Sequence, residues 1–320
     1  NGPARIAATV EGGSFKTGNQ AASLSGSKAN FDYAFNVTHF RAADTPVTPP
    51  ELLPPGRLAI GNFYDNLTLS TKLGLDLSES FRLNYTARYT EAELKYTQDE
   101  FLPPTFAGVP NAYQSILNTK QFFTRGEAVW KGFDGRFTNY FGVNYTDHRS
   151  EERFMASSAP VVTSGDRVKV DWRGVTLLMP GQTLVTGAEH EVEKMSTAVL
   201  NADNANSGVY AQLQSEFAQR FFVVSNVRHD VNERFGDATT FRIAPAVILP
   251  VTETKLKASY GSGFKAPTLS QLFVDFLPSF VANPNLRPEE SLGYDVGFEQ
   301  PVWNNRLRFG ATYFNNDIKN

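Results

Sequence analysis

The feature that most constrains the fold is an alternation of apolar and polar residues that runs along almost the whole chain. In the segment 81–89, Phe81, Leu83 and Tyr85 fall on one face of a strand, while Arg82 and Asn84 fall on the other. This follows because successive side chains of a β-strand point to opposite sides. The sequence therefore predicts an all-β, antiparallel fold with one apolar face and one charged, polar face. The same period recurs in the segments 67–77, 167–172, 255–260, 291–299 and 306–313.

The composition argues against a helical membrane protein but not against a membrane β-barrel. Of the 320 residues, 41% are hydrophobic and 20% are charged, and the mean hydropathy is -0.31. The longest apolar runs, such as residues 246–250, are far too short for a membrane-spanning helix. A transmembrane β-barrel remains compatible with these values, because its alternating strands average to a polar composition.

Connections of two lengths are predicted to alternate along the chain. If every short turn lies at one end of the strands, every long loop lies at the other, which is the asymmetry of outer-membrane barrels. We therefore expect a transmembrane β-barrel, with a soluble β-sandwich as the alternative. The short turns are expected at 26–30, 77–80, 131–135, 179–182, 217–220, 250–254 and 301–305. The long connections are expected at 41–63, 97–119, 151–166, 199–206, 232–239 and 265–290.

The pattern contains about fifteen strands, which is an odd number. Single-chain bacterial barrels close with an even number, since an unpaired edge in lipid leaves backbone groups without hydrogen-bond partners. We therefore expect residues 1–320 to form one β-barrel domain that is part of a larger barrel, with further strands after Asn320.

One stretch, residues 261–291, interrupts the alternation with several prolines and phenylalanines. The segment Asn283-Pro284-Asn285 has turn chemistry, because the proline fixes its own φ and restricts the residue before it. A pre-shaped loop folded over one end of the strands is the simplest interpretation. A short helix that Pro278 ends is predicted from apolar residues at helical spacing, namely Leu269, Leu272, Phe273 and Phe276.

The motifs of this stretch carry a resemblance to a known family. GSGFKAP at 261–267 is followed by NPNLRPEES at 283–291 and by the aromatic-rich strand YDVGFE at 294–299. This double box resembles that of TonB-dependent outer-membrane receptors, and the segments 10–40 and 309–320 are similar to barrel strands of the same family. The loop motif that the resemblance assigns comprises Phe264, Lys265, Ala266, Pro267, Phe273, Phe276, Asn283, Pro284, Asn285, Leu286, Pro288 and Glu289.

The resemblance implies a barrel of about 22 strands with a plugged lumen. It implies a location in the outer membrane of a Gram-negative bacterium, among outer-membrane lipids. Such a receptor binds a scarce, large ligand at its outer loops and imports it with energy from TonB, an inner-membrane protein that acts through the plug. We expect the plug and the last strands to lie outside residues 1–320.

The resemblance limits the candidate ligands to two classes. The spacing of SYGSGFKAPTLSQLF, residues 259–273, looks most like the cobalamin branch of the family. Haem receptors of the family place a histidine between the two boxes, and residues 268–282 contain none. Cobalamin and ferric siderophores therefore both remain candidates. The four histidines of the chain lie at no metal-ligand spacing, so neither a metal site nor a bound cofactor is predicted.

Other function classes find little support in the sequence. The formal net charge is -3 without basic blocks, which argues against nucleic acid as a partner. Residues 261–266 match a dinucleotide-binding motif, but Pro267 follows at once and the sequence predicts no long crossover helix after it. No catalytic constellation is predicted, so the protein is not expected to be an enzyme. A general diffusion porin is the nearest alternative function, and a soluble β-rich binding protein is the third.

Overall fold

The structure, a computed structural model, describes residues 2–105, 107–155, 158–275 and 281–320. It contains a 15-stranded antiparallel sheet in which each strand is hydrogen-bonded to its neighbours in the chain. The predicted all-β class and the strand count are therefore confirmed. The strands are β1 (Arg5–Gly13), β2 (Thr17–Lys28), β3 (Phe31–Thr45), β4 (Asn62–Asp76), β5 (Phe81–Leu102), β6 (Ala107–Gly132), β7 (Phe137–Arg153), β8 (Val161–Met179), β9 (Gln182–Thr197), β10 (Asn201–Phe217), β11 (Phe221–Asn232), β12 (Gly236–Ile248), β13 (Lys255–Lys265), β14 (Glu289–Val302) and β15 (Leu307–Lys319).

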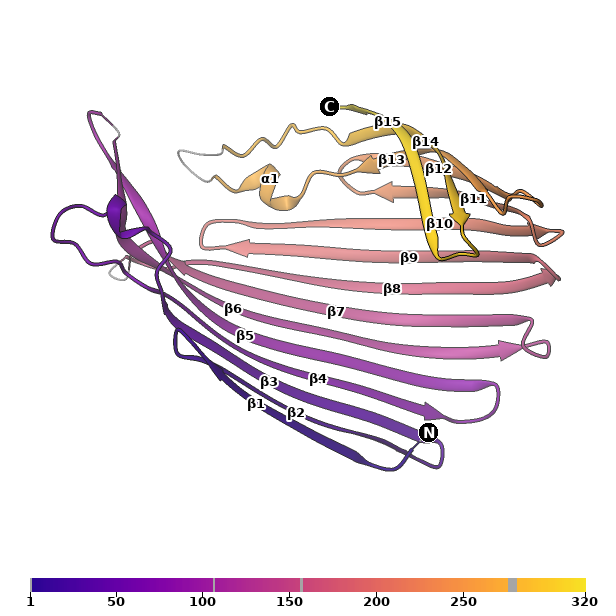
Figure 1. Ribbon diagram of the computed structural model, residues 1–320, viewed down its shortest axis with the longest axis horizontal. Coiled ribbons are helices and arrows are strands. Elements are labelled where there is room, and N and C mark those ends of the chain that lie inside the picture. Colours follow the sequence, from indigo (N-terminus) through magenta and orange to yellow (C-terminus); the bar gives the residue numbers. More distant parts are fainter. Residues whose placement is uncertain (1, 106, 156–157, 276–280) are drawn as a thin grey trace. The chain divides into compact units, whose positions relative to one another are not determined.

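The chain divides into two compact units. Unit 1 comprises Asn1–Glu127, Val143–Val168 and Lys194–Asn201, and unit 2 comprises Ala128–Gly142, Lys169–Glu193 and Ala202–Asn320. Within unit 1, the strands β1 to β5 lie side by side in chain order (Figure 1).

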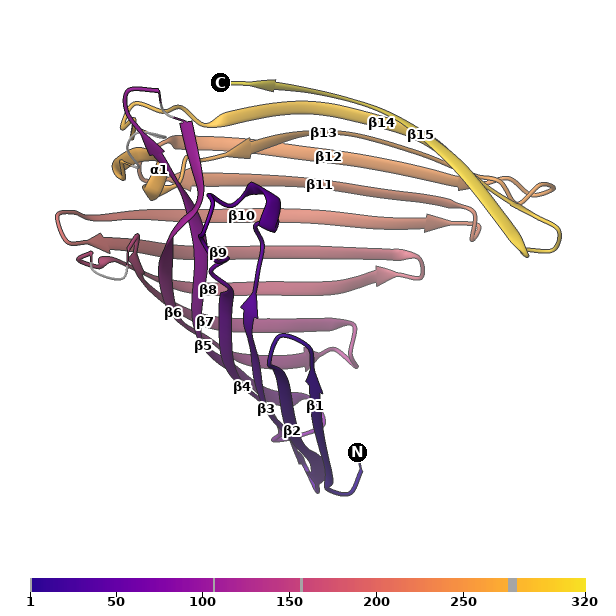
Figure 2. The ribbon, with the colours of Figure 1, turned by 60° about the vertical axis from the view of Figure 1, so that its left-hand side comes forward.

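Two short helices complete the described elements, η1 (Pro50–Leu52) in unit 1 and α1 (Leu269–Phe273) in unit 2. The helix α1 lies beyond the end of β13 (Figure 2). Neither of these helices, which are those of the described ranges, is long and apolar enough to cross a membrane.

The apolar face of the sheet is exposed. Leu69 and Leu83 in unit 1 are 43% and 38% exposed, and Val296 in unit 2 is 56% exposed. A soluble sandwich buries such a face against a second sheet, whereas the described strands form a single sheet. An apolar surface of this extent needs an apolar environment, so the sandwich alternative is wrong.

The polar face carries charges that are paired across strands. In unit 1, Arg82 of β5 contacts Asp32 of β3 at 2.5 Å and Asp76 of β4 at 3.0 Å. In unit 2, Arg228 of β11 contacts Glu189 of β9 at 2.6 Å, and Glu189 also contacts Lys169 of β8 at 2.6 Å. Pairing of this kind lets the polar face hold charge without leaving carboxylates or guanidinium groups unmatched.

All seven predicted short turns are present, and they connect alternate strand pairs from β2–β3 to β14–β15. Several have positive φ at residues other than glycine, such as 52° at Phe133 and 54° at Asp134. Positive φ at both central residues is the type I′ geometry, whose twist matches that of the flanking strands. These hairpins therefore turn tightly at one end of the strands.

Three of the predicted long connections are wrong, and a fourth, 151–166, is shorter than predicted, because β7 continues to Arg153 and β8 begins at Val161. The strands β5 and β6 extend to Leu102 and Ala107, so most of 97–119 is a long hairpin and not a loop. The predicted loops 199–206 and 232–239 shrink to the short turns before Asn201 and Gly236. The error has a physical reason: these segments are rich in residue types that favour turns, namely Pro, Gly, Asn and Asp, yet their backbones continue the ladder of hydrogen bonds.

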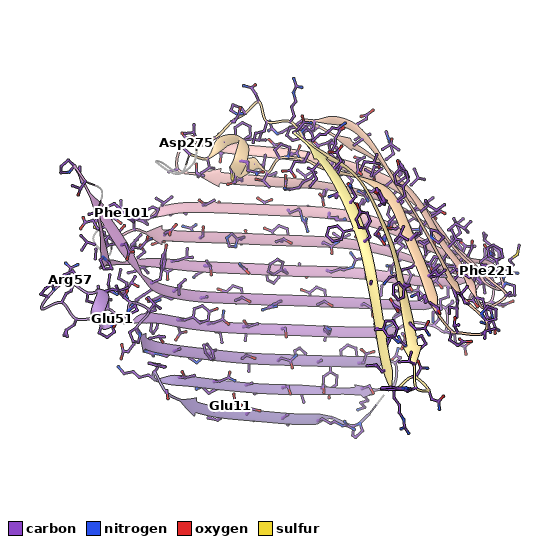
Figure 3. The ribbon with its side chains drawn as sticks, turned by 45° about the horizontal axis from the view of Figure 1, so that its top comes forward. Glu11, Glu51, Arg57, Phe101, Phe221 and Asp275 are labelled. Carbon is purple, nitrogen blue, oxygen red and sulfur yellow. The ribbon has the colours of Figure 1, made fainter. Side chains whose placement is uncertain are left out.

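The loop between β3 and β4 is pinned to β6 by one buried asparagine. Asn111, which is 0% exposed, accepts a hydrogen bond from the Ile60 amide at 2.8 Å and donates to Thr48 Oγ1 at 3.2 Å. The Asn111 amide itself donates to Asp99 Oδ1 at 3.1 Å. Figure 3 labels Glu51 and Arg57 on this loop. The loop is therefore held in one shape and not left as a free connection.

We expect Asn111→Ala to loosen this loop locally. The substitution leaves the amide of half-buried Ile60 without its side-chain acceptor, which costs about 1 kcal/mol, and hydrogen exchange at that amide should speed up accordingly. Asn111 has a φ of 57°, which glycine adopts without strain. Asn111→Gly therefore removes the side chain without straining the backbone. If the Ile60 amide exchanges its hydrogen at the parent rate in both variants, the Asn111 side chain does not hold this loop.

Candidate functional site

The loop between β13 and β14 is closed at its base by an ion pair. Lys265 ends β13 and Glu289 begins β14, and the two are register partners. The Lys265 ammonium lies 3.3 Å from the Glu289 carboxylate. Both side chains are well exposed, so the pair contributes little to stability. The two ends of the loop are held beside each other by the antiparallel pairing of β13 with β14, and the ion pair lies at the end of that pairing.

The helix α1 begins with a capping box. The Gln271 amide donates to Thr268 Oγ1 at 3.2 Å, and the Thr268 amide donates to Gln271 Oε1 at 2.9 Å. Two backbone donors at the helix start are thereby satisfied. The helix ends at Phe273, and Val274 is already extended, with φ -112° and ψ 114°. It is thus shorter than predicted, since the chain leaves the helical conformation before Pro278.

The segment Asn283-Pro284-Asn285 forms the predicted turn and is docked onto α1. The Asn285 amide donates to Asn283 Oδ1 at 3.0 Å, and the Leu286 amide donates to the Asn283 carbonyl at 3.2 Å. The Asn283 amide donates to the carbonyl of Gln271 at 3.1 Å. The second box of the motif is therefore tied directly to the helix that follows the first box.

The same helix is anchored on the rim of unit 2. Leu269 and Leu272 are 6% and 2% exposed, among the few buried apolar side chains of the described residues. The guanidinium of Arg234, in the turn between β11 and β12, lies 5.3 Å from the centroid of the Phe273 ring. Arg234 Nε also donates to the carbonyl of Asp203 at 2.7 Å. The loop therefore rests on a neighbouring turn instead of projecting freely.

The structure places the motif residues along one short path of unit 2. Phe264 and Lys265 end β13, Ala266 and Pro267 lead to α1, and Phe273 closes the helix. The turn residues Asn283, Pro284, Asn285 and Leu286 return to α1, and Pro288 precedes the first residue of β14, Glu289. Phe276, the remaining member of the predicted motif, lies outside the described residues. Asp275, just past the helix, is labelled in Figure 3.

Two contributors to this site were missed by the sequence reasoning. Gln271 was readable, because Thr268-x-x-Gln271 before an apolar pair is the spacing of a capping box. Arg234 was not, because its contact with Phe273 joins residues far apart in the chain and no local pattern marks it. Within the described ranges, no group of three or more His, Asp or Glu side chains is placed to hold a metal ion.

Comparison with known proteins gives this architecture a family. A family model described as TonB dependent receptor-like, beta-barrel matches residues 8–320, which is almost the whole chain. The chain belongs to the TonB-dependent receptor β-barrel family. The resemblance carried by the two boxes is therefore confirmed, although which residues contact a ligand stays a prediction.

Several curated relatives of this receptor family are similar to the chain. The vitamin B12 transporter BtuB of Photobacterium profundum is 32% identical over 236 residues, which are 73% of this chain and 36% of the relative. BtuB of Vibrio vulnificus is 24% identical over 240 residues, again 73% of this chain and 36% of the relative. Heme/hemopexin utilization protein C of Haemophilus influenzae is 27% identical over 198 residues, 48% of this chain and 28% of the relative. The chain spans about a third of the length of the BtuB relatives that it matches.

Solved structures of TonB-dependent receptors share the fold. The siderophore receptor PirA from Acinetobacter baumannii superposes with a TM-score of 0.76 at 12% identity, over 100% of this chain and 53% of that one. The ferric enterobactin receptor PfeA superposes with a TM-score of 0.74 at 16% identity, over 99% and 53%. The copper transporter OprC does so with 0.73 at 14%, over 99% and 53%. At such identities these likenesses show the barrel fold and not the ligand.

Proposed function

We propose that the natural protein is an outer-membrane receptor that binds a scarce, large ligand, cobalamin or a ferric siderophore, and imports it with TonB-coupled energy. The observation that carries the proposal is the family match over residues 8–320, which includes both boxes of the docked loop. No step of this function is a chemical conversion, since receptors of this family transport their ligands.

The geometry of unit 2 supports a preorganised binding loop. The pairing of β13 with β14 at its base, the capping box and the docked Asn-Pro-Asn turn restrict the conformation of the loop at three points. A loop that is already ordered loses little conformational entropy when a large ligand binds. The loop motif therefore shapes the ligand-binding end of the receptor, with Phe273 held against Arg234 instead of reaching for ligand.

Cobalamin is the first ligand to test. A relative that is 32% identical over most of this chain bears the name of a vitamin B12 transporter. Siderophore receptors and a copper transporter share the fold at identities below 25%, so the fold alone does not choose among ligands. A haem ligand is less favoured, because residues 268–282 contain no histidine between the boxes.

The two faces of the sheet indicate how the protein lies in the outer membrane. We place the exposed apolar face against outer-membrane lipid and the face with paired charges toward the lumen, as in transmembrane barrels generally. Contact with TonB would occur through a plug, as in the receptors that the two boxes resemble.

Ligand choice can be tested with the purified natural protein in detergent. Calorimetric titrations with cyanocobalamin, ferric enterobactin and hemin should show saturable binding of cobalamin or the siderophore, and none of hemin. Saturable binding of hemin alone would overturn the proposed ligand class. Failure to bind any of the three, in protein that is folded by circular dichroism, would count against a receptor for this ligand class.

A further inference from the structure

Two basic residues on the polar face of unit 1 have no acidic partner. Lys72 of β4 and Arg88 of β5 are both exposed, and neither forms an ion pair with any residue that the structure describes. The register partner of Lys72 is Thr86, and that of Arg88 is Ser70. The two basic residues are therefore diagonal neighbours, with Cα atoms about 7 to 8 Å apart. We call Lys72 and Arg88 the basic pair.

The nearest carboxylates of this face are held by another residue. Asp32 is the register partner of Gly74 and so lies diagonal to Lys72. Arg82 contacts Asp32 at 2.5 Å and Asp76 at 3.0 Å. Over residues 31–42, 63–76 and 81–95 the polar face thus carries three bases and two carboxylates, which leaves one positive charge in excess.

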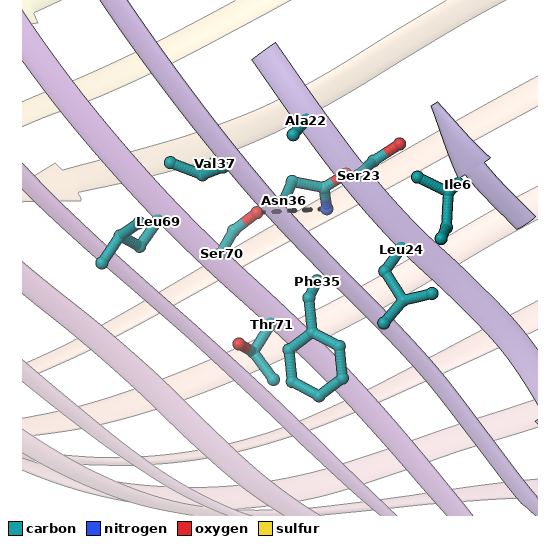
Figure 4. Close-up of a pocket in the computed structure, with 10 residues that line it drawn as sticks. All are labelled: Ile6, Ala22, Ser23, Leu24, Phe35, Asn36, Val37, Leu69, Ser70 and Thr71. Carbon is teal, nitrogen blue, oxygen red and sulfur yellow. Dashed lines mark hydrogen bonds between the residues drawn. The ribbon is translucent and has the colours of Figure 1, made fainter. Parts of the chain in front are cut away.

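Hydroxyl and amide side chains surround the basic pair. Arg88 Nε donates to Thr90 Oγ1 at 3.4 Å, and Thr90 Oγ1 lies 3.3 Å from Thr68 Oγ1. Ser70 Oγ accepts a hydrogen bond from Asn36 Nδ2 at 3.4 Å (Figure 4). Such groups can donate hydrogen bonds to an anion, but they carry no charge that would neutralise the guanidinium group.

The arrangement is unfavourable while it is empty. Like charges at neighbouring positions of two strands weaken the sheet slightly. A group with negatively charged oxygens, placed between the two side chains, would remove this repulsion and form charge-assisted hydrogen bonds with both. The basic pair is therefore complementary to an oxyanion.

The basic pair lies toward the short-turn end of the strands. Lys72 is four residues from Asp76, where β4 ends, which corresponds to about 13 Å along the strand. In the orientation proposed above, the polar face lines the lumen and the ligand enters at the long loops. A ligand on its way to the short-turn end therefore has to pass the level of the basic pair.

We propose that the basic pair is a transit site in the lumen for an oxyanion of the transported ligand, namely a catecholate, carboxylate or phosphate group. The inference rests on the function proposed above and narrows it to ligands that carry such a group. Cations on the wall of a cavity raise the local concentration of anions and speed their entry. Because both side chains are exposed, the attraction is weak enough to release the ligand again.

A passing ligand is favoured over a fixed carboxylate from elsewhere in the receptor. The fixed pairs of this face, such as Arg82 with Asp76, join groups of opposite charge directly. The basic pair is bordered by uncharged hydroxyl groups instead, and neutral hydrogen bonds of this kind hold an anion less tightly than a second ion pair would.

The test measures surface binding and uptake separately, with radiolabelled ferric enterobactin and cyanocobalamin as the probes. Cells produce the natural protein or its Lys72→Gln/Arg88→Gln variant. The Kd of surface binding is measured without functional TonB, and the initial rate of accumulation is measured with it. We expect the variant to keep the parent Kd and to accumulate ligand about fivefold to tenfold more slowly.

A charge-preserving exchange is the matched control. The variant Lys72→Arg/Arg88→Lys keeps both charges and should accumulate ligand at nearly the parent rate. In urea unfolding, Lys72→Gln/Arg88→Gln should be at least as stable as the parent, because the repulsion between like charges is removed. Slow uptake that accompanies a loss of stability in both variants would show a structural role and would overturn the proposal.

Photocrosslinking identifies the occupant of the site. Benzoylphenylalanine replaces Thr86, the register partner of Lys72, or Leu69 on the apolar face as the control. We expect labelled ligand to attach at position 86 but not at position 69, and only in cells with functional TonB. Crosslinks from position 86 to another part of the receptor, and none to ligand, would identify a fixed partner and overturn the proposal.

The outcomes separate this inference from the proposed function. The probe that the parent transports identifies the oxyanion, which is a catecholate in ferric enterobactin and a phosphate diester in cyanocobalamin. If the parent accumulates a probe and Lys72→Gln/Arg88→Gln does so at the same rate, the transit site is wrong while the receptor function stands. If the parent binds neither probe, both fail.

Discussion

Replacing Leu83 by arginine is expected to lower the free energy of unfolding in a lipid bilayer by about 2 to 4 kcal/mol. Leu83 is 38% exposed on the apolar face of β5, opposite Leu75 of β4. In our account this face meets hydrocarbon, where a guanidinium loses its hydration without gaining a partner. Urea unfolding of the natural protein, reconstituted in vesicles and followed by tryptophan fluorescence, measures the loss.

The matched control is Thr86→Arg on the polar face of the same strand. Thr86 lies opposite Lys72, so the new charge faces a like charge and costs at most about 1 kcal/mol. A clear difference between the two variants supports the assignment of the faces. Equal losses of stability would mean that the apolar face does not meet lipid.

Replacing Asn283-Pro284-Asn285 by three glycines is expected to weaken ligand binding roughly tenfold to hundredfold. Each replacement by glycine raises the conformational entropy of the unbound loop, which costs about 0.4 to 1 kcal/mol when the bound loop is ordered. For three positions the loss of binding free energy is about 1 to 3 kcal/mol. The loss of the Asn283 side chain also removes its hydrogen bond from the Asn285 amide, which spans 3.0 Å. The unfolding transition of the barrel should hardly move, since the turn lies outside the sheet. Calorimetric titration with the ligand identified above measures the change.

A triple-glycine variant of the β14–β15 turn is the control for this experiment. Trp303, Asn304 and Asn305 have positive φ values of 52°, 53° and 66°, so glycine suits their backbone. This turn lies at the other end of β14 from the loop motif, and its replacement should leave affinity unchanged. If both variants bind ligand as tightly as the parent, the loop does not organise the site.

The strands could be predicted from the sequence because their physical cause is local. The alternation of Phe81, Leu83 and Tyr85 with polar neighbours fixes both the strand and its two faces. The seven short turns were placed for the same reason, since the period breaks there. The extent of β5 and β6 could not be predicted, because Pro103, Pro104, Gly108 and Pro110 interrupt the alternation and favour a loop. Pairing of the two backbones nevertheless continues both strands through much of this segment.

The candidate site was predictable only in its local parts. The Asn-Pro-Asn turn depends on residues adjacent in the chain, and the structure contains it as expected. Two other contacts depend on the hairpin register, which brings distant residues together. They are the contact of Arg234 with Phe273 and the hydrogen bond between Asn111 and the Ile60 amide. A sequence shows which residues are able to make such contacts, but only the fold selects the pair.

Uptake of labelled ligand in the presence and absence of TonB tests the central claim most directly. Cells that carry the natural protein as their single outer-membrane route for cobalamin, or for the siderophore if that is the ligand, are compared with cells that also lack a functional TonB. The account predicts that ligand binds to the surface of both strains but accumulates inside only when TonB is functional. Accumulation that proceeds equally without TonB would contradict the account and would identify a diffusion channel instead.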